Sequence, residues 1–252
     1  MSLPLEDALR TAQAAADRAR REVLSRFRRV AVETKRDGSP VTEADREAER
    51  VIRETLRDAF PDHRILGEEY GAEGGDAEGP CWVIDPIDGT IAFARGIPLF
   101  STLIALLDDG EPVLGLIDLP ALDERYTAIR GGGCQRNGSP TRVSDESDLR
   151  RAIVSHGDPF CFALYHRTDV FERMAREIPM LRGYTDAFGH ALVLGGGVGA
   201  MVDLNLNVWD AAATQLLVPE AGGRCETLPE VDGKLGLVFG SPSLVEQLLR
   251  FF

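Results

Sequence analysis

A short apolar run that stops abruptly at a carboxylate constrains this chain more than any other feature. Residues 81–84 (CWVI) are followed directly by Asp85, Pro86, Ile87 and Asp88. A short apolar run bounded by turn residues predicts a buried strand that ends in a loop. Proline restricts the conformations of that loop, so that both carboxylates and the Ile87 carbonyl could face one place. These oxygens suit Mg2+, which prefers oxygen ligands in octahedral geometry.

The two residues after this loop extend the prediction from a metal to a phosphate group. Gly89 permits a close backbone approach to a phosphate, and the amides of Gly89 and Thr90 could donate to it. Asp, Pro and Gly also favour tight turns, so an ordinary turn is the alternative interpretation. The convergence of several polar groups after a buried strand favours the functional interpretation.

Other acids also stand where apolar segments end. Glu68 follows the apolar run 65–67, and Asp210 stands at the start of a predicted helix. Asp45 closes the sequence 42–45 (TEAD), which is typical of a helix N-terminus. Each acid has an ordinary alternative: a solvated charge for Glu68, a helix-end charge for Asp45 and an N-cap for Asp210. Together they are candidates to complete the metal site.

The first half of the chain predicts two helices followed by a sheet. Apolar residues recur with helical spacing over 5–27 and again over 42–59, where Pro61 ends the pattern. The period then changes, and short apolar runs predict strands at 81–84, 99–107, 112–119 and 125–129. The turn 108–110 (DDG) indicates that two of these strands form a hairpin. We therefore expect an antiparallel or mixed sheet with the first two helices on one face.

The second half of the chain alternates short strands with helical segments. The predicted elements are strands at 152–155 and 200–206 and helices at 166–177, 187–194, 210–220 and 243–252. Glycine runs at 195–197 and 222–223 end two of these helices. The pattern predicts an α/β protein in two halves that share a cleft. We expect residues 1–145 to carry the metal loop and residues 146–252 to complete the active-site cleft.

Composition limits the partners of this chain. Its 41 acidic residues outnumber the 28 basic ones, and the net charge of −13 argues against nucleic-acid or anionic-membrane binding. The four cysteines are scattered, with no pair at the spacing of zinc ligands, and predict reduced thiols. No apolar run approaches the roughly 20 residues that span a bilayer. These features predict a cytoplasmic protein without nucleic-acid or membrane partners.

Three motifs, taken in order, resemble the inositol monophosphatase superfamily. They are 67–69 (GEE), 82–90 (WVIDPIDGT) and 209–210 (WD) ahead of 220–223 (EAGG). The match spans nearly the whole chain with close to the spacing of the family. The stretches that most resemble the histidinol-phosphatase branch are 92–98, 102–106, 110–118 and 184–189. The resemblance implies an α/β fold, a layered αβαβα sandwich with mixed sheets and helix pairs.

The resemblance also implies a set of metal ligands. Glu68, Asp85 and the Ile87 carbonyl would hold a first Mg2+, and Asp85, Asp88 and Asp210 would hold a second. A third, weaker ion could join near Glu68, which makes two or three ions per active site. Such a site provides an in-line water, neutralises the phosphoryl charge and stabilises the leaving alkoxide. It needs no covalent intermediate.

The catalytic roles follow from the same resemblance. Glu68 and Thr90 would orient the attacking water, with Asp45 behind Thr90 as a supporting acid. Lys35 matches a family lysine near the metal site, although a solvated surface lysine is an equal alternative. The expected reaction is the hydrolysis of a small phosphate monoester. Relatives are commonly homodimers, so a homodimer is expected.

Two acids in the second half are the candidates for substrate recognition. Asp203 lies seven residues before Asp210, where relatives carry an acid that meets the leaving alcohol, and Asp186 could line the same pocket. An acid there could pair with the ammonium group of histidinol or accept hydrogen bonds from inositol hydroxyls. Relatives in the histidinol-phosphatase branch usually carry a basic residue after Asp-Gly-Thr, whereas Ile91 stands here. The stretches that resemble the histidinol-phosphatase branch nevertheless make histidinol phosphate the expected substrate, with inositol, nucleotide and sugar phosphates as alternatives.

Other functional classes fit this sequence poorly. Haloacid-dehalogenase phosphatases place two acids two residues apart and form a phospho-enzyme, but Asp85 and Asp88 are three apart. The glycine run 195–199 precedes a predicted strand, whereas a dinucleotide-binding loop follows one. The four histidines offer no triad with a serine elbow. A relative that only binds a ligand would be a non-enzymatic alternative, but every expected metal-binding residue is present.

Overall fold

Two long helices form where the apolar periodicity predicts them. The computed structural model describes residues 4–29, 33–34, 40–76 and 79–252. Helices α1 (Leu5–Arg26) and α2 (Glu43–Ala59) pack together through buried alanine, valine, isoleucine and leucine side chains. Thr42 is the N-cap of α2, where its backbone amide donates to Asp45 Oδ2 at 2.7 Å. This capping box gives the second helix a defined start.

The predicted meander belongs to an eight-stranded sheet of order β10-β9-β8-β7-β6-β5-β3-β4. Its strands are β3 (Arg64–Gly67), β4 (Gly71–Glu73), β5 (Cys81–Asp88), β6 (Ser101–Asp108), β7 (Glu111–Leu119), β8 (Glu124–Ile129), β9 (Gln135–Arg136) and β10 (Ser139–Pro140). Among the described residues of this sheet, only β3 and β5 pair in parallel. The predicted strands after residue 99 are confirmed as β6, β7 and β8, while β1 (Glu33–Thr34) and β2 (Pro40–Val41) form a separate pair.

A five-stranded mixed sheet of order β12-β11-β13-β15-β14 follows. Its strands are β11 (Val154–His156), β12 (Leu181–Arg182), β13 (Ala200–Leu206), β14 (Arg224–Val231) and β15 (Lys234–Gly240). The strand predicted at 200–206 is confirmed, whereas the one predicted at 152–155 begins two residues later. The β14–β15 hairpin was absent from the prediction. Its signal is the dipeptide Asp232-Gly233, which takes positive φ angles of 50° and 77° in the turn.

The remaining helices differ from the prediction mainly at their ends. They are α3 (Thr90–Ala94), α4 (Pro159–Leu164), α5 (Thr168–Glu177), α6 (Asp186–Leu194), α7 (Val208–Glu220) and α8 (Pro242–Leu249), with a 3-10 turn at Pro120–Leu122. The helix predicted at 166–177 starts later because His166 has a left-handed φ of 56°. Helix α4 was missed, although Asp158 caps it through the Phe160 amide and proline occupies its first turn.

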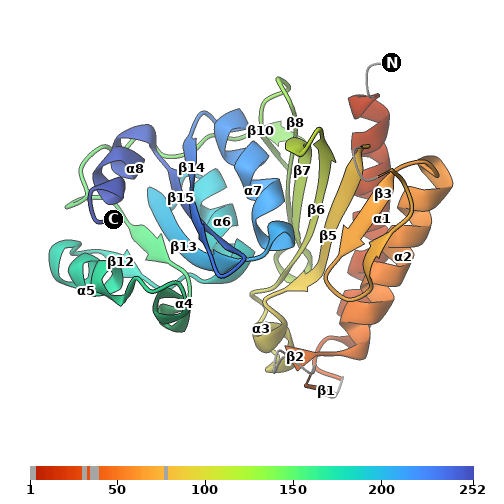
Figure 1. Cartoon of the computed structure of the whole chain (residues 1–252), viewed down its shortest axis with the longest axis horizontal. Coiled ribbons are helices and arrows are strands. Elements are labelled where there is room, and N and C mark those ends of the chain that lie inside the picture. Colours follow the sequence, from red (N-terminus) through yellow and green to blue (C-terminus); the bar gives the residue numbers. More distant parts are fainter. Residues whose placement is uncertain (1–3, 30–32, 35–39, 77–78) are drawn as a thin grey trace.

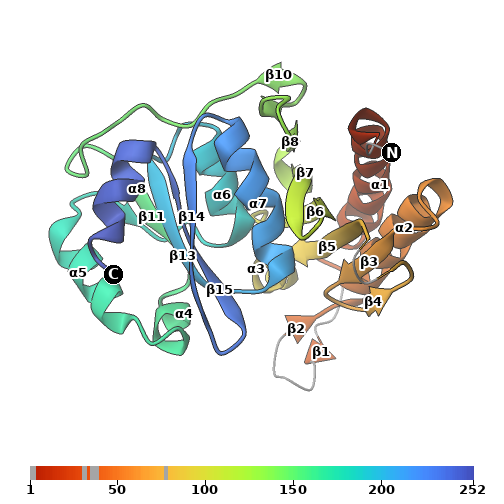
Figure 2. The same cartoon turned by 45° about the horizontal axis from the view of Figure 1, so that its top comes forward.

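The two sheets and their helices stack in five layers. Figures 1 and 2 show α1 and α2 on the outer face of the larger sheet, with α6 and α7 between the sheets. Helices α4, α5 and α8 cover the outer face of the smaller sheet. A Cβ atom at Gly115 of β7 would lie 2.7 Å from the Ala213 carbonyl oxygen, so glycine permits α7 to approach the sheet. The expected αβαβα sandwich is confirmed.

The predicted division of the chain at residue 145 stays a prediction. The larger sheet ends at Pro140 and the smaller one begins at Val154. However, one hydrophobic core joins side chains of both sheets with those of α6 and α7. The segment around residue 145 therefore connects the two sheets, and α6 and α7 pack against both halves of the chain.

Two features relate to the predictions made from composition. In the described part of the chain, no helix combines the length and apolar character needed to cross a membrane. All four cysteines are free thiols, and only Cys134 is fully buried. The second observation agrees with the predicted reduced thiols.

Candidate active site

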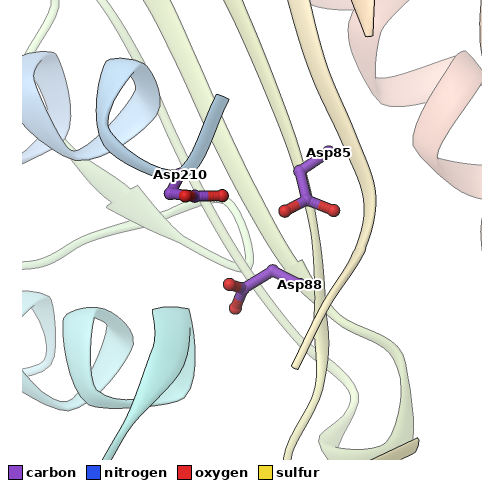
Figure 3. A group of neighbouring side chains, drawn as sticks. All are labelled: Asp85, Asp88 and Asp210. Atoms are coloured by element: carbon purple, nitrogen blue, oxygen red, sulfur yellow. The ribbon is translucent and has the colours of Figure 1, made fainter. Parts of the chain in front are cut away.

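The strand that carries the predicted metal loop does not stop at Asp85 but continues irregularly to Asp88. Its pairing with β6 shifts register between these two residues. Pro86 lies within the shift, where it has no amide hydrogen to donate, and its carbonyl accepts a hydrogen bond from Thr102 Oγ1 at 2.8 Å. The two carboxylates consequently face the same space as Asp210 (Figure 3).

Asp85, Asp88 and Asp210 form an acidic cluster. One carboxylate oxygen from each lies within 4.8 Å of the others. Figure 3 shows that the first two come from the end of β5 and the third from the start of α7. Asp85 Oδ1 is buried and has no hydrogen-bond partner among the described residues. Because an unpaired buried carboxylate oxygen is costly, the cluster fits a divalent cation that prefers oxygen ligands.

A capping box holds Asp210 in the cluster. The N-cap role considered for Asp210 is wrong, because Asn207 occupies that position and Asp210 lies three residues further on. Asp210 Oδ2 accepts hydrogen bonds from the Asn207 amide at 2.7 Å and from Asn207 Nδ2 at 3.2 Å. Lys234 Nζ donates to Asn207 Oδ1 and so fixes the capping residue. The capping box that begins α7 therefore also fixes the position of the candidate metal ligand Asp210.

Asp88 connects the metal loop to the second half of the chain. Its Oδ2 accepts hydrogen bonds from Ser101 Oγ at 2.9 Å and from the Ala187 amide at 2.7 Å. The Ala187 amide belongs to the first turn of α6, where free amides favour an anion. Neither donor was predicted. A polar residue such as Ser101 within the predicted strand 99–107 is only a weak sequence signal for such a donor. A backbone amide gives no sequence signal at all.

Asp45 serves both its helix and the metal loop. It is fully buried, and its Oδ2 accepts hydrogen bonds from the Thr42 amide at 2.7 Å and from the Thr42 hydroxyl at 2.6 Å. Its Oδ1 accepts a hydrogen bond from Thr90 Oγ1 at 3.1 Å, and Thr90 Oγ1 also lies 2.9 Å from the Ile87 carbonyl oxygen. Gly89 has a left-handed φ of 80°, which lets α3 begin at Thr90. Asp45 is therefore both a capping-box residue of α2 and the acceptor of a hydrogen bond from Thr90.

Glu68 reaches the same cleft from the turn between β3 and β4. Its amide donates to the Ile84 carbonyl oxygen at 3.2 Å. Glu68 lines a cleft of about 220 Å³ together with the acidic cluster, Ile87, Gly89 and Thr90. Lys35 lies outside the described residues. The other residues predicted to hold metal or to orient water are therefore brought together.

Burial and mutual repulsion raise the pKa values of the clustered acids. For Asp85 the pKa is raised first by burial and then by the charge of Glu68. For Asp88 the pKa is raised by burial and by Asp186, and burial raises the pKa of Asp210 to about 6. Acids with raised pKa values favour protons in the absence of another cation. Binding of a divalent cation would therefore release protons from this cluster.

Asp186 and Asp203 also line the cleft. Asp203 is buried in β13, and its Oδ2 lies 3.0 Å from Nε2 of the buried His190. His190 Nδ1 lies 2.7 Å from Thr214 Oγ1, so Asp203 is held through a chain of hydrogen bonds. Gly157 makes room for it, because a Cβ atom there would overlap the Asp203 carboxylate. The role of His190 was not predicted, since a histidine in an apolar helix carries no local signal.

The cleft is lined by further polar residues and opens beside a largely apolar cavity. Asp158 and Cys161 also line it, and none of its described lining residues is lysine or arginine. Burial, followed by the charge of Asp203, raises the pKa of Asp186 to about 6. The neighbouring cavity of about 440 Å³ shares Glu68, Gly89, Thr90, Asp158 and Asp186 with the cleft. Its apolar lining comes from Ile91, Ala92, Ile97, Leu99, Tyr184 and Phe188. The arrangement suits a divalent cation, a phosphate and a cationic or hydroxyl-bearing group beside it.

The sequence and the fold both match known proteins. The family model described as inositol monophosphatase family matches residues 4–247. A histidinol-phosphatase from Chlorobaculum parvum is 40% identical over 198 residues, which cover 79% of this chain and 76% of that protein. A fructose-1,6-bisphosphatase/inositol-1-monophosphatase from Thermotoga maritima is 40% identical over 184 residues, covering 73% and 69%. The crystal structure of extragenic suppressor protein suhB from Bartonella henselae superposes with a TM-score of 0.90 at 30% identity, covering 97% and 98%.

Proposed function

Because the chain belongs to the inositol monophosphatase family, we propose that it is a Mg2+-dependent phosphatase that converts histidinol phosphate to histidinol and phosphate. The similarity to a histidinol-phosphatase over most of the chain supports this substrate. The name of the Thermotoga relative supports inositol or sugar phosphates as the alternative. One observation carries the proposal: three aspartates from two distant segments, the buried Asp85 and the half-buried Asp88 and Asp210, converge on one space. The homodimer and the cytoplasmic location stay predictions.

The acids of the cleft divide into two proposed ligand sets. Glu68, Asp85 and the Ile87 carbonyl would hold one Mg2+, and Asp85, Asp88 and Asp210 a second. A third ion would lie near Glu68. Bound Mg2+ supplies a nucleophilic water and neutralises charge on the phosphoryl group and the leaving oxygen. The orphaned Asp85 Oδ1 supports its place in both sets.

Thr90 and Glu68 would orient the attacking water. The Thr90 hydroxyl proton points inward to Asp45 or to the Ile87 carbonyl oxygen. A lone pair of Thr90 Oγ1 is therefore available to accept a hydrogen bond from water in the cleft. Glu68 would accept the proton that the attacking water loses, and the leaving alkoxide would take a proton from solvent water to become the alcohol. Amides of Gly89 and Thr90 would contact the phosphate.

Asp203 and Asp186 would recognise the alcohol that is released. Both line the cleft, and Asp203 is fixed by the buried His190. The ammonium group of histidinol would form charge-assisted hydrogen bonds with these carboxylates. The lack of lysine and arginine among the described lining residues agrees with a cationic alcohol.

Replacing Asp203 with asparagine should separate cationic from neutral substrates. The variant removes one charge from the alcohol side of the cleft while keeping an acceptor near His190. We expect kcat/KM for histidinol phosphate to fall by about 10- to 100-fold, because a charged hydrogen bond contributes about 1.5–3 kcal/mol. The kcat/KM for p-nitrophenyl phosphate, whose alcohol has no cation, should stay close to that of the unaltered enzyme. An equal loss on both substrates would show that Asp203 does not select the cation.

Stabilisation by Mg2+ should depend on pH. Since the pKa of Asp210 is raised to about 6 in the folded chain, the metal-free folded state binds protons that the unfolded state has lost. Its stability should fall as pH rises from about 4 through 6, and Mg2+ should restore it. The rise in Tm on addition of Mg2+ should be several degrees larger at pH 8 than at pH 5. Differential scanning fluorimetry with and without Mg2+ measures this difference, and a pH-independent shift would contradict it.

A panel of phosphate monoesters tests the proposed substrate. Release of phosphate with Mg2+ would be measured for histidinol phosphate, inositol 1-phosphate, a sugar phosphate and a nucleotide 3'-phosphate. We expect the largest kcat/KM for histidinol phosphate. A low rank for that substrate would refute the proposed alcohol and leave the metal mechanism in place. Inactivity on the whole panel would refute the phosphatase proposal itself.

A further inference from the structure

A buried ion pair on α2 lies beside the turn that carries Glu68. Glu49 is 0% exposed, Arg53 is 4% exposed, and Arg53 Nε donates to Glu49 Oε1 at 2.7 Å. Neither side chain is among the described residues that line the cleft. Burying two charges is costly, so such a pair is weak evidence of a stabilising role. Its contacts with the neighbouring turn provide a different explanation.

The Glu49 carboxylate accepts hydrogen bonds from the backbone of that turn. The Glu69 amide donates to Oε2 at 2.7 Å, and the Tyr70 amide donates to Oε1 at 3.1 Å. Successive amides directed at one anion form a nest, a geometry that the anion itself stabilises. The backbone immediately after Glu68 is thus shaped around a carboxylate from another element.

The residue immediately before Glu68 is adapted to the same carboxylate. A Cβ atom at Gly67 would overlap the Glu49 carboxylate group. Glycine at this position therefore allows the carboxylate to approach the turn closely. In sequence, Glu68 is therefore preceded by a glycine that leaves room for the Glu49 carboxylate. It is followed by two residues whose amides donate hydrogen bonds to that carboxylate.

Arg53 holds the opposite end of the turn. Its Nη2 donates to the Gly71 carbonyl oxygen, and its Nη1 donates to Glu73 Oε2 at 3.1 Å. Its guanidinium lies 5.9 Å from the ring centroid of Tyr70. The ion pair consequently contacts three residues of this turn: Glu69, Tyr70 and Gly71.

We infer that Glu49 and Arg53 are positioning residues that fix the Glu68 carboxylate in the metal cleft. This inference rests on the proposed function, in which Glu68 is a metal ligand. A ligand on a preorganised turn loses less conformational freedom when the ion binds. Partners that orient metal ligands typically change metal affinity by about 10- to 100-fold when they are removed.

The first experiment compares two glutamates on the same helix. Glu49→Gln removes the charge to which the turn amides donate, whereas Glu54→Gln removes a partly exposed pair with Arg18. Isothermal titration calorimetry with Mg2+ on the metal-free protein should show about 10- to 100-fold weaker binding for E49Q and unchanged binding for E54Q. Hydrogen exchange of the Glu69 and Tyr70 amides should be faster in metal-free E49Q only.

A double variant separates positioning from simple loss of stability. In Glu49→Met with Arg53→Met, both buried charges are replaced by apolar side chains, so the fold should keep a Tm close to that of the unaltered chain. The turn amides lose the Glu49 carboxylate in this variant too, so Mg2+ binding should be at least as weak as in E49Q. If E49Q proved unable to fold, this variant would decide the question alone.

Wild-type Mg2+ affinity in the folded double variant would overturn the inference. Unchanged exchange of the Glu69 and Tyr70 amides in E49Q would also overturn it. Both readouts are independent of turnover, so they stand even if the unaltered chain releases no phosphate from any monoester. In that event the proposed function would fail, and the effect of Glu49 on the turn would still be measured.

Discussion

Replacing Asp210 with asparagine should lower kcat for phosphate release on the order of 10³-fold while making the metal-free protein more stable. The carboxylate is one of three acids whose oxygens meet within 4.8 Å in the cleft. Losing a metal ligand removes several kcal/mol of transition-state stabilisation, and about 4 kcal/mol corresponds to a factor of 10³. The capping bond should survive, because an asparagine oxygen can still accept the Asn207 amide hydrogen.

The gain in stability follows from the raised pKa values. Burial raises the pKa of Asp210 to about 6, which means that its charged form is disfavoured in the fold. Removing the charge should stabilise the metal-free protein at pH 8 by up to about 3 kcal/mol, since one pKa unit corresponds to about 1.4 kcal/mol. The rise in Tm on addition of Mg2+ should shrink at the same time.

Asp123 provides the matched control for this substitution. It is an exposed acid whose described partner is Arg20, with Nη1 2.6 Å from Asp123 Oδ1. Asparagine tolerates the left-handed φ of 54° at this position. Asp123→Asn should leave kcat, Tm and the Mg2+ response close to those of the unaltered chain. A lower metal-free Tm in D210N than in D123N would contradict the account of the acidic cluster.

Replacing Asp118 with asparagine should destabilise the fold by about 3 kcal/mol, which corresponds to a fall in Tm of about 6–12 °C. Asp118 is fully buried in β7 and accepts hydrogen bonds from two arginines. Arg20 from α1 donates at 2.7 and 3.1 Å, and Arg125 from β8 donates at 2.7 Å. Removing the shared carboxylate leaves two partly buried guanidinium groups without their main acceptor.

This effect should be confined to stability. Asp118 is not among the described residues of the cleft, so kcat of the folded variant at 25 °C should be unchanged. Thermal and denaturant unfolding measured beside Asp123→Asn, which removes a different acid from the same Arg20, would isolate the buried carboxylate. Equal Tm values for D118N and D123N would show that burial does not matter here.

Local sequence signals predicted the parts of the site that lie close together in the chain. The loop from Asp85 to Thr90 combines a buried strand, proline and glycine, so its acids could be proposed as metal ligands before the fold was known. The helical stripes of α1 and α2 predicted both helices within about one residue of their observed ends. Hydrophobic periodicity is strongest in such long segments.

Partners that meet only through the fold could not be predicted in the same way. The bond from the Ala187 amide to Asp88 and the chain from Asp203 through His190 to Thr214 join residues far apart in sequence. The β14–β15 hairpin was missed because no residue of β14 is fully buried and the strand lacks a clear apolar pattern. Glu49 has the same difficulty: in sequence it is one more acid on a charged helix, and only its burial distinguishes it.

The most direct test of the central claim is the release of phosphate from histidinol phosphate by metal-stripped protein as Mg2+ is added back. The acidic cluster predicts no turnover without a divalent cation and a saturable return of activity with Mg2+. The same titration with D210N should need far more Mg2+ and reach a much lower plateau. Full activity in metal-stripped protein, or no phosphate release at any Mg2+ concentration, would contradict the account.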